Sequence, residues 1–111
     1  MRQLHAPQLA EWLQAAGGEA AAHAPQLLDV REPWEVAIAP LPGAVNIPMG
    51  EIGTRHGELD AHRPVVCVCH HGVRSLHVAH FLQRRGFADV LNLAGGVDAW
   101  AREVDPAFPT Y

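Results

Sequence analysis

A cysteine followed by a short polar loop is the part of this sequence best suited to chemistry. Cys69 is followed by His70, His71, Gly72, Val73, Arg74 and Ser75. A glycine lets successive backbone amides converge on one point, and an arginine adds a charge that persists at physiological pH. A negatively charged sulfur would be stabilised there. The pattern therefore predicts a nucleophilic thiolate at Cys69 and an anion-binding loop over residues 70–75.

A second cysteine, Cys67, lies only two residues before Cys69. On a strand the two side chains would share one face about 7 Å apart, which is too far for an unstrained disulfide. Because Cys67 falls within an apolar segment and not at its end, we interpret it as a buried core thiol. Two free thiols are typical of a reducing compartment, so we expect a cytoplasmic protein.

The elements on either side of the loop explain how Cys69 would be positioned. Residues 64–69 are apolar and rich in β-branched side chains, which predicts a central strand buried on both faces. A helix is predicted over residues 74–85, with Gly86 as its cap and Leu76, Ala79 and Leu82 facing a sheet. In parallel α/β sheets, ligands bind beyond the carboxyl ends of the strands, and Cys69 falls at such an end.

The remaining sequence alternates between helix and strand signals. A first helix is predicted from Pro7 to Gly17, followed by a soft surface loop over residues 17–22. Further strands are predicted at 27–30, 44–47 and 90–93, and a last short helix at 97–101, after Gly95 and Gly96. This alternation predicts one α/β domain over residues 1–111 with a mostly parallel sheet. We expect the extended tail at about 104–111 to pack on the domain, and Trp34 and Trp100 to be wall or core aromatics.

Composition excludes several classes of function. The 111 residues carry a formal net charge of -4, which argues against nucleic-acid and anionic-membrane partners. No run of 18 apolar residues is present. All eight basic residues are arginine, so Schiff-base and pyridoxal-phosphate chemistry, which require lysine, are excluded.

Histidines near the cysteines raise the alternative of a metal site. The residues that crowd this stretch are Cys67, Cys69, His70, His71, His77 and His80. His77 and His80 could share a helix face, but Cys69 and His70 precede that helix, so one ion could not easily reach all of them. We therefore expect no metal here and a solvent-facing position for His77 and His80. His70 and His71 would rim the pocket, where they could attract an anion or steer an acceptor thiol.

Three segments together resemble the single-domain rhodaneses. The loop from Cys69 to Ser75 is similar to the family's Cys-x-x-Gly-x-Arg-Ser signature. Residues 27–35 with 42–48 resemble its N-terminal signature, and residues 93–100 its C-terminal one. The resemblance implies a five-stranded, mainly parallel sheet flanked by helices on both faces. It also implies that Cys69 carries sulfur, that Arg74 and Ser75 help to shape the loop, and that Asp29 and Arg31 belong to a supporting hydrogen-bond network.

The resemblance implies a sulfurtransferase reaction without metal or organic cofactor. A thiosulfate-like donor would pass its outer sulfur to Cys69, and the persulfide would pass it to cyanide or to a thiol, including a protein thiol. A persulfide carrier or binding module with little turnover is the alternative. Related phosphatases and arsenate reductases have five residues between the cysteine and the arginine, whereas this chain has four and no acidic residue in the loop. One departure, residues 39–42 in place of a common His-Ile pair, suggests a local change of loop shape.

Overall fold

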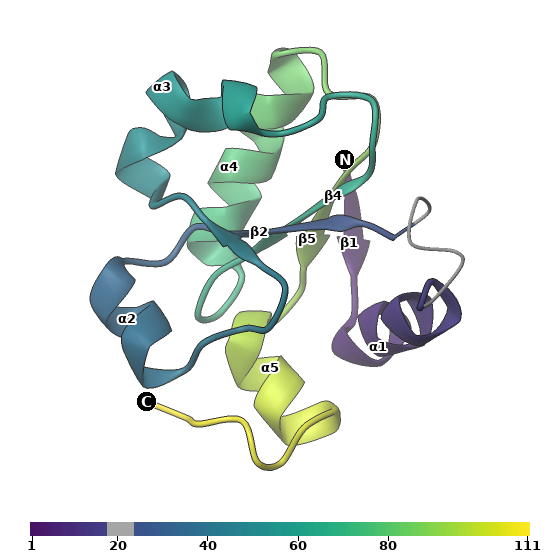
Figure 1. The fold of residues 1–111 in the computed structure, drawn as a ribbon, viewed down its shortest axis with the longest axis vertical. Coiled ribbons are helices and arrows are strands. Elements are labelled where there is room, and N and C mark those ends of the chain that lie inside the picture. The colour runs from purple at the N-terminus through teal and green to yellow at the C-terminus, as the bar shows by residue number, and fades with distance from the viewer. Residues whose placement is uncertain (18–23) are drawn as a thin grey trace.

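The computed structural model describes residues 1–17 and 24–111, which form a small α/β domain (Figure 1). Its five strands are all parallel and follow the order β1-β5-β4-β2-β3. They are β1 (Arg2–Leu4), β2 (Gln26–Asp29), β3 (Val45–Asn46), β4 (Val65–Val68) and β5 (Val90–Leu93). The predicted parallel α/β sheet with its central strand at residues 64–69 is therefore confirmed. Most of the surface loop expected at residues 17–22 lies outside the described residues.

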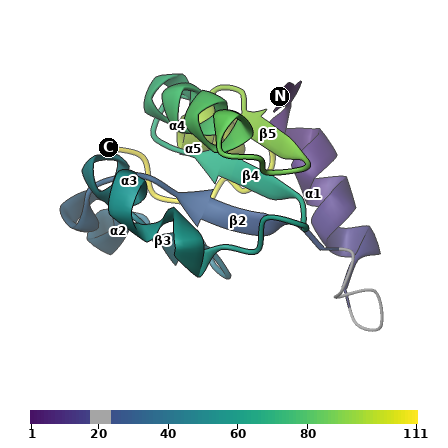
Figure 2. The same ribbon diagram turned by 90° about the horizontal axis from the view of Figure 1, so that it is seen from above.

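Helices cover both faces of the sheet, as predicted (Figure 2). The helices are α1 (Ala6–Ala15), α2 (Pro33–Ile38), α3 (Ile52–Arg55), α4 (Val73–Arg84) and α5 (Gly96–Glu103), with 3-10 turns η2 (Met49–Glu51) and η3 (His56–Glu58). Helices α1 and α5 pack together on one face, and α3 and α4 lie on the other. Each βα connection therefore brings its loop to the same edge of the sheet.

The alternation of side chains along β4 divides the core into two layers. Val66 and Val68 belong to the layer shared with α1 and α5, whereas Val65 and Cys67 belong to the layer shared with α4. All four residues are buried, because a parallel strand between two helical layers has no solvent face. Burying each valine stabilises the fold by about 1.5–3 kcal/mol.

Helix α4 closely matches its predicted range. It begins at Val73, one residue earlier than predicted, because Gly72 adopts a left-handed conformation with φ 96° immediately before it. Ala79 and Leu82 are buried against the sheet as expected, whereas Leu76 is half-buried. His77 and His80 are exposed, as predicted.

The edge strand β1 carries no strong signal in the sequence. Residue patterns predict four strands. The family resemblance implies a fifth, and in the structure the fifth strand is this three-residue segment. Its residues pair with β5, Arg2 opposite Leu91 and Leu4 opposite Leu93. Because Arg2 and Gln3 are exposed, β1 lacks the run of apolar residues that identifies a buried strand in a sequence.

The two tryptophans expected to be wall or core aromatics differ. Trp100 is half-buried and packs against the core, but Trp34 is 61% exposed, so a core position for it is wrong. Trp34 lies in the first turn of the short helix α2, whose buried side chain is Glu35. The tail packs as expected, with Phe108 buried in the core. Among the described residues, no helix has the length and apolar character needed to cross a bilayer.

Candidate active site

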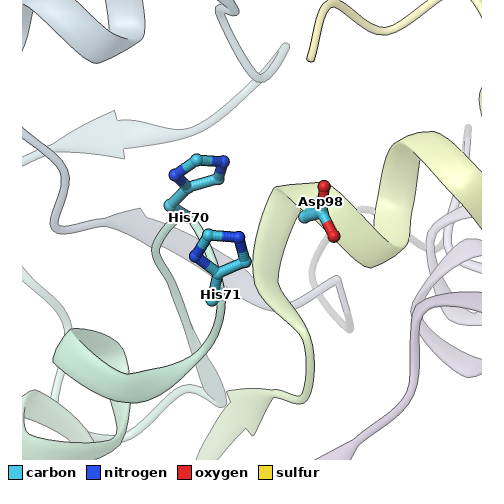
Figure 3. Close-up of side chains that lie close together, drawn as sticks. All are labelled: His70, His71 and Asp98. Carbon is cyan, nitrogen blue, oxygen red and sulfur yellow. The ribbon is translucent and has the colours of Figure 1, made fainter. Parts of the chain in front are cut away.

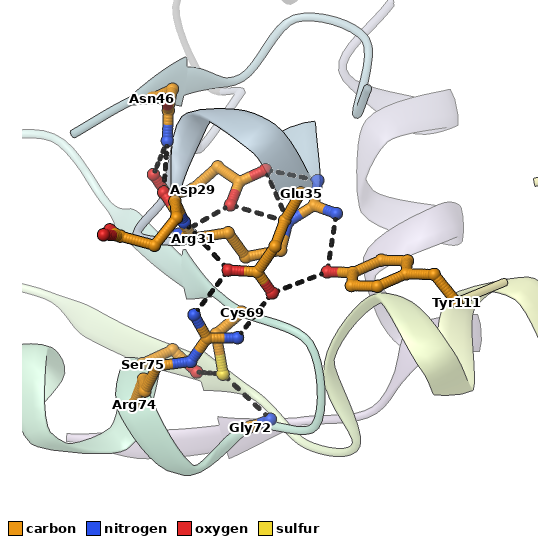
Figure 4. A network of polar contacts seen from close by, with 10 residues as sticks. Asp29, Arg31, Glu35, Asn46, Cys69, Gly72, Arg74, Ser75 and Tyr111 are labelled. Atoms are coloured by element: carbon orange, nitrogen blue, oxygen red, sulfur yellow. Dashed lines mark hydrogen bonds and ion pairs between the residues drawn. The ribbon is translucent and has the colours of Figure 1, made fainter. Parts of the chain in front are cut away.

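Cys69 follows the last residue of β4 and is buried at the base of the loop that leads to α4 (Figure 4). Its Sγ accepts a hydrogen bond from the backbone N–H of Gly72 at 3.0 Å. The Ser75 hydroxyl donates a second one at 3.3 Å. Two donors aimed at one sulfur stabilise a negative charge on it, which is the arrangement that a nucleophilic thiolate requires.

The position of Gly72 is set by its contacts with β5 and the segment after it. A Cβ at this residue would lie 3.1 Å from the Gly95 nitrogen and 3.2 Å from the Leu93 oxygen, and φ is 96°. The buried Asn92 donates from Nδ2 to the Gly72 carbonyl oxygen at 3.0 Å. These contacts turn the Gly72 amide toward Sγ, so a larger residue would displace the donor.

The start of α5 is docked against the carbonyl groups of the same loop. The backbone N–H groups of Val97 and Asp98 donate to the carbonyl oxygens of Cys69 at 2.9 Å and His70 at 3.1 Å. Gly96 has φ 60°, and a Cβ there would overlap both oxygens. The glycines of the C-terminal signature therefore permit a helix end to approach the loop that holds Cys69.

Arg74 is directed to a buried carboxylate and not to the sulfur. Its two terminal nitrogens donate to the oxygens of Glu35 at 2.7 and 2.8 Å, which joins α4 to α2. The hydrogen bonds from Arg74 lower the pKa of Glu35 to about 2, and the same pair raises the pKa of Arg74. The arginine charge expected beside Cys69 is thus balanced by Glu35, which fixes the shape of the loop.

Asp29 and Arg31 form a second, fully buried ion pair next to the first. Arg31 donates from Nη2 to Asp29 at 2.7 Å and to the carbonyl oxygen of Ala39 at 2.8 Å. Burial lowers the pKa of Arg31, but its hydrogen bonds to Asp29 and Tyr111 outweigh this and leave the pKa raised. The pair ties β2 to the loop at residues 39–42, where the sequence departs from the common family pattern.

Tyr111 connects the two ion pairs and contacts the loop (Figure 4). Its hydroxyl accepts from Arg31 Nη1 at 3.1 Å and donates to Glu35 Oε1 at 3.0 Å. Its ring stacks on His70 with 4.0 Å between centroids. The segment after α5 therefore forms part of the wall around the site.

The remaining residues of the loop lie at its surface. His71 and Val73 are exposed and His70 is half-buried, so both histidines lie at the surface of the loop. Burial, followed by the nearby His71, lowers the pKa of His70. Of the predicted loop residues, Gly72 and Ser75 contact the sulfur, and Arg74 contacts Glu35.

Cys67 is enclosed in the core, and its surroundings contrast with those of Cys69. The residue has no exposed surface, and it pairs in register with Leu28 and Asn92 on the two neighbouring strands. Burial, and to a lesser degree the nearby Cys69, raises the pKa of the Cys67 thiol to about 12. A thiol in this environment remains protonated and inert, as predicted for a core cysteine.

Three residues of the site were not identified from the sequence: Glu35, Asn92 and Tyr111. Asn92 had a usable signal, because it is the polar residue in an otherwise apolar, buried strand. Glu35 had a weaker one, because it lies three residues after Glu32 and accepts from its N–H at 2.9 Å in a capping box. Tyr111 had none, since its partners lie 76 and 80 residues away.

Comparison with known proteins supports the resemblance seen in the sequence. The family model described as a rhodanese-like domain matches residues 9–103. A chloroplastic rhodanese-like/PpiC domain-containing protein of Arabidopsis thaliana is 42% identical over 90 residues, covering 78% of this chain but only 30% of the plant protein. A protein named sulfurtransferase from Allochromatium vinosum is 42% identical over 76 residues, 68% of this chain and 71% of that protein.

A solved structure agrees over the whole chain. The rhodanese-like domain protein of Staphylococcus aureus superposes with a TM-score of 0.81 at 28% identity, covering 100% of this chain and 99% of the other. The superposition covers the whole sheet, and the family model covers the strands β2 to β5, the Cys69 loop and α5. The chain therefore belongs to the rhodanese-like domain family.

Proposed function

We propose that this protein is a sulfurtransferase that carries a sulfane sulfur on Cys69 as a persulfide. The observation that carries the proposal is the pair of hydrogen bonds from Gly72 and Ser75 to the Cys69 Sγ at the end of the central strand. The name of the Allochromatium vinosum relative, sulfurtransferase, points to the same chemistry.

The proposed reaction is a double displacement. The Cys69 thiolate attacks the outer sulfur of a thiosulfate-like donor, the donor S–S bond breaks, and sulfite leaves with the electron pair. In the second step, cyanide or a thiolate attacks the outer sulfur of the persulfide, the new S–S bond breaks, and the Cys69 thiolate is restored. No external oxidant or reductant is consumed.

The loop would act mainly by holding negative charge. The Gly72 amide is held in place by the hydrogen bond from Asn92 to the Gly72 carbonyl oxygen, so it needs no reorganisation when the thiolate returns, and the buried Ser75 hydroxyl is the second donor. Asp29 and Arg31 would support the loop indirectly, through the network that includes Tyr111 and Glu35. The rim histidines would receive the donor anion or an acceptor thiol, which includes the thiol of a partner protein.

The state of Arg74 favours sulfur transfer over phosphate chemistry. A cysteine phosphatase uses an arginine fork to bind phosphate oxygens, whereas both terminal nitrogens of Arg74 are occupied by Glu35. The proposed location is the cytoplasm, because a free thiolate at Cys69 needs a reducing compartment.

Steady-state kinetics with thiosulfate and cyanide test the proposal. A double displacement gives parallel lines in double-reciprocal plots, because sulfite leaves before cyanide binds. Intersecting lines would contradict the persulfide intermediate. If turnover is undetectable while thiosulfate still adds one sulfur to the protein, the chain is a persulfide carrier and the enzymatic part of the proposal fails.

A further inference from the structure

A group of potential metal ligands lies at the rim of the loop, separate from the sulfur. One ligand atom from each of His70, His71 and Asp98 lies within 4.8 Å of the others (Figure 3). The group contains two of the histidines that lie close together in the sequence, His70 and His71, whereas His77 and His80 are exposed along α4 and are not part of it. Asp98 belongs to this group from α5, 28 residues after His70 in the sequence.

The backbone holds the two contributing segments in place. The Asp98 N–H donates a hydrogen bond to the His70 carbonyl oxygen at 3.1 Å. The carboxylate and the imidazole therefore belong to two residues whose backbones are hydrogen-bonded to each other. Gly96 allows this approach, since any Cβ there would overlap the His70 oxygen. The conformational entropy lost in bringing the helix and the loop together is therefore lost when the protein folds, before any ion binds.

The side chains differ in how firmly they are held. The His70 ring lies between the rings of Tyr111 and His71, at centroid distances of 4.0 and 3.9 Å. His71 is exposed and can turn about its side-chain bonds. Asp98 Oδ2 accepts one hydrogen bond from the exposed Arg102 at 3.3 Å, and its Oδ1 is the second carboxylate oxygen available to a ligand.

We propose that His70, His71 and Asp98 form a binding site for one divalent transition-metal ion of the Zn²⁺ type. Two imidazoles and one carboxylate suit Zn²⁺, whereas Ca²⁺ and Mg²⁺ prefer sites made of oxygen ligands. Three protein ligands leave a fourth position open for water or a small anion. The site lies on the residue that follows Cys69, so an occupied site would place positive charge at the mouth of the loop.

Calorimetric titration of the untagged protein with ZnCl₂ tests the site. The titration is made in the wild type and in Cys69→Ser, which removes the thiolate as a competing ligand and makes the result independent of sulfur transfer. We expect one equivalent of Zn²⁺ in both. In the Cys69→Ser background, His71→Ala and Asp98→Asn should each weaken binding by at least about ten-fold.

The matched control is the pair of exposed α4 histidines. His77→Ala and His80→Ala should leave the Zn²⁺ affinity unchanged, and thermal unfolding without metal shows whether each variant folds. Loss of binding in Cys69→Ser would identify the thiolate as the ligand and overturn the proposal. Unchanged affinity in both Asp98→Asn and His71→Ala would overturn it as well. Co²⁺ absorption gives a second readout, since the visible bands of a four-coordinate ion should disappear in Asp98→Asn.

Discussion

Cys67 and Cys69 contribute to the same layer of the core, yet the groups around their sulfur atoms differ. Cys67 lies within β4 between two neighbouring strands, and burial raises the pKa of its thiol to about 12. Cys69 is as deeply buried, but it lies where the strand ends, and two hydrogen-bond donors point at its sulfur. Burial alone therefore does not distinguish the two cysteines. The hydrogen-bond donors that the loop directs at the Cys69 sulfur distinguish them.

The strongest test of this comparison replaces each sulfur by oxygen. Cys69→Ser should reduce thiosulfate:cyanide turnover by more than about 1,000-fold, because it removes the nucleophile. Cys67→Ser is the matched control, because Cys67 lies two residues earlier in the chain and is similarly buried, and its turnover should stay within about three-fold of the wild type. Equal loss in the two variants would mean that the assignment of the reacting thiol is wrong.

Alkylation compares the two thiols without any substrate. At pH 8 a thiol of pKa about 12 is ionised in only about one molecule in 10,000, so Cys67 should resist iodoacetamide. We expect the Cys67→Ser variant, which retains Cys69, to react at least about 100-fold faster than the Cys69→Ser variant. Raising the pH toward 12 should accelerate the Cys67 reaction, and intact-mass measurements follow both rates. Similar rates at pH 8 would remove the distinction between the two sites.

The Glu35–Arg74 pair offers a way to disturb the Cys69 loop while leaving Cys67 in place. Because the pKa of Glu35 in the folded protein is about 2, below its ordinary value of 4.5, the pair stabilises the fold fully above pH 4.5. This contribution is lost as the pH falls through 2. Glu35→Gln should therefore lower the free energy of unfolding by about 2 kcal/mol at pH 7, measured in urea. The difference from the wild type should disappear near pH 2.

A surface pair provides the control for this prediction. Arg55 and Glu58 also form an ion pair, but both side chains are well exposed. Glu58→Gln should leave the urea midpoint unchanged, because water screens the interaction.

Turnover should fall by about ten-fold in Glu35→Gln, since Arg74 and the Cys69 loop lose the carboxylate that holds them. A Glu35→Gln variant with normal stability at pH 7 would show that Arg74 does not depend on this carboxylate.

Tyr111 should have the smallest effect on the Cys69 region. Tyr111→Phe keeps the ring that stacks on His70 but removes the hydroxyl that bonds Arg31 and Glu35. We expect a loss of about 1 kcal/mol in the free energy of unfolding, with turnover within about three-fold of the wild type. Thr110→Ala, at the exposed neighbouring residue, should change neither quantity. A loss of turnover without a loss of stability would give the hydroxyl a direct part in the reaction.

The sequence predicted the parts of the site that depend on local order. Cys69 could be placed at the end of a strand because residues 64–68 are apolar, and Gly72 could be recognised because the turn before α4 needs a left-handed residue. The partners of Arg74 could not be predicted in the same way. Glu35 lies 39 residues away, and its proximity depends on how α2 is placed over the sheet edge.

The errors have the same physical origin. Trp34 was expected to be a wall or core residue because large aromatic side chains are usually buried, but the short helix α2 turns Glu35 inward instead. Strand β1 was not identified because an exposed edge strand of three residues leaves no apolar pattern. Both outcomes depend on tertiary contacts that residue types alone do not encode.

The most direct test of the proposed function locates the transferred sulfur. Intact masses are measured after incubation with thiosulfate, and again after cyanide, for the wild type, Cys67→Ser and Cys69→Ser. We predict one added sulfur that cyanide removes in the wild type and in Cys67→Ser, and none in Cys69→Ser. Sulfur retained by Cys69→Ser, or lost from Cys67→Ser, would contradict a persulfide on Cys69.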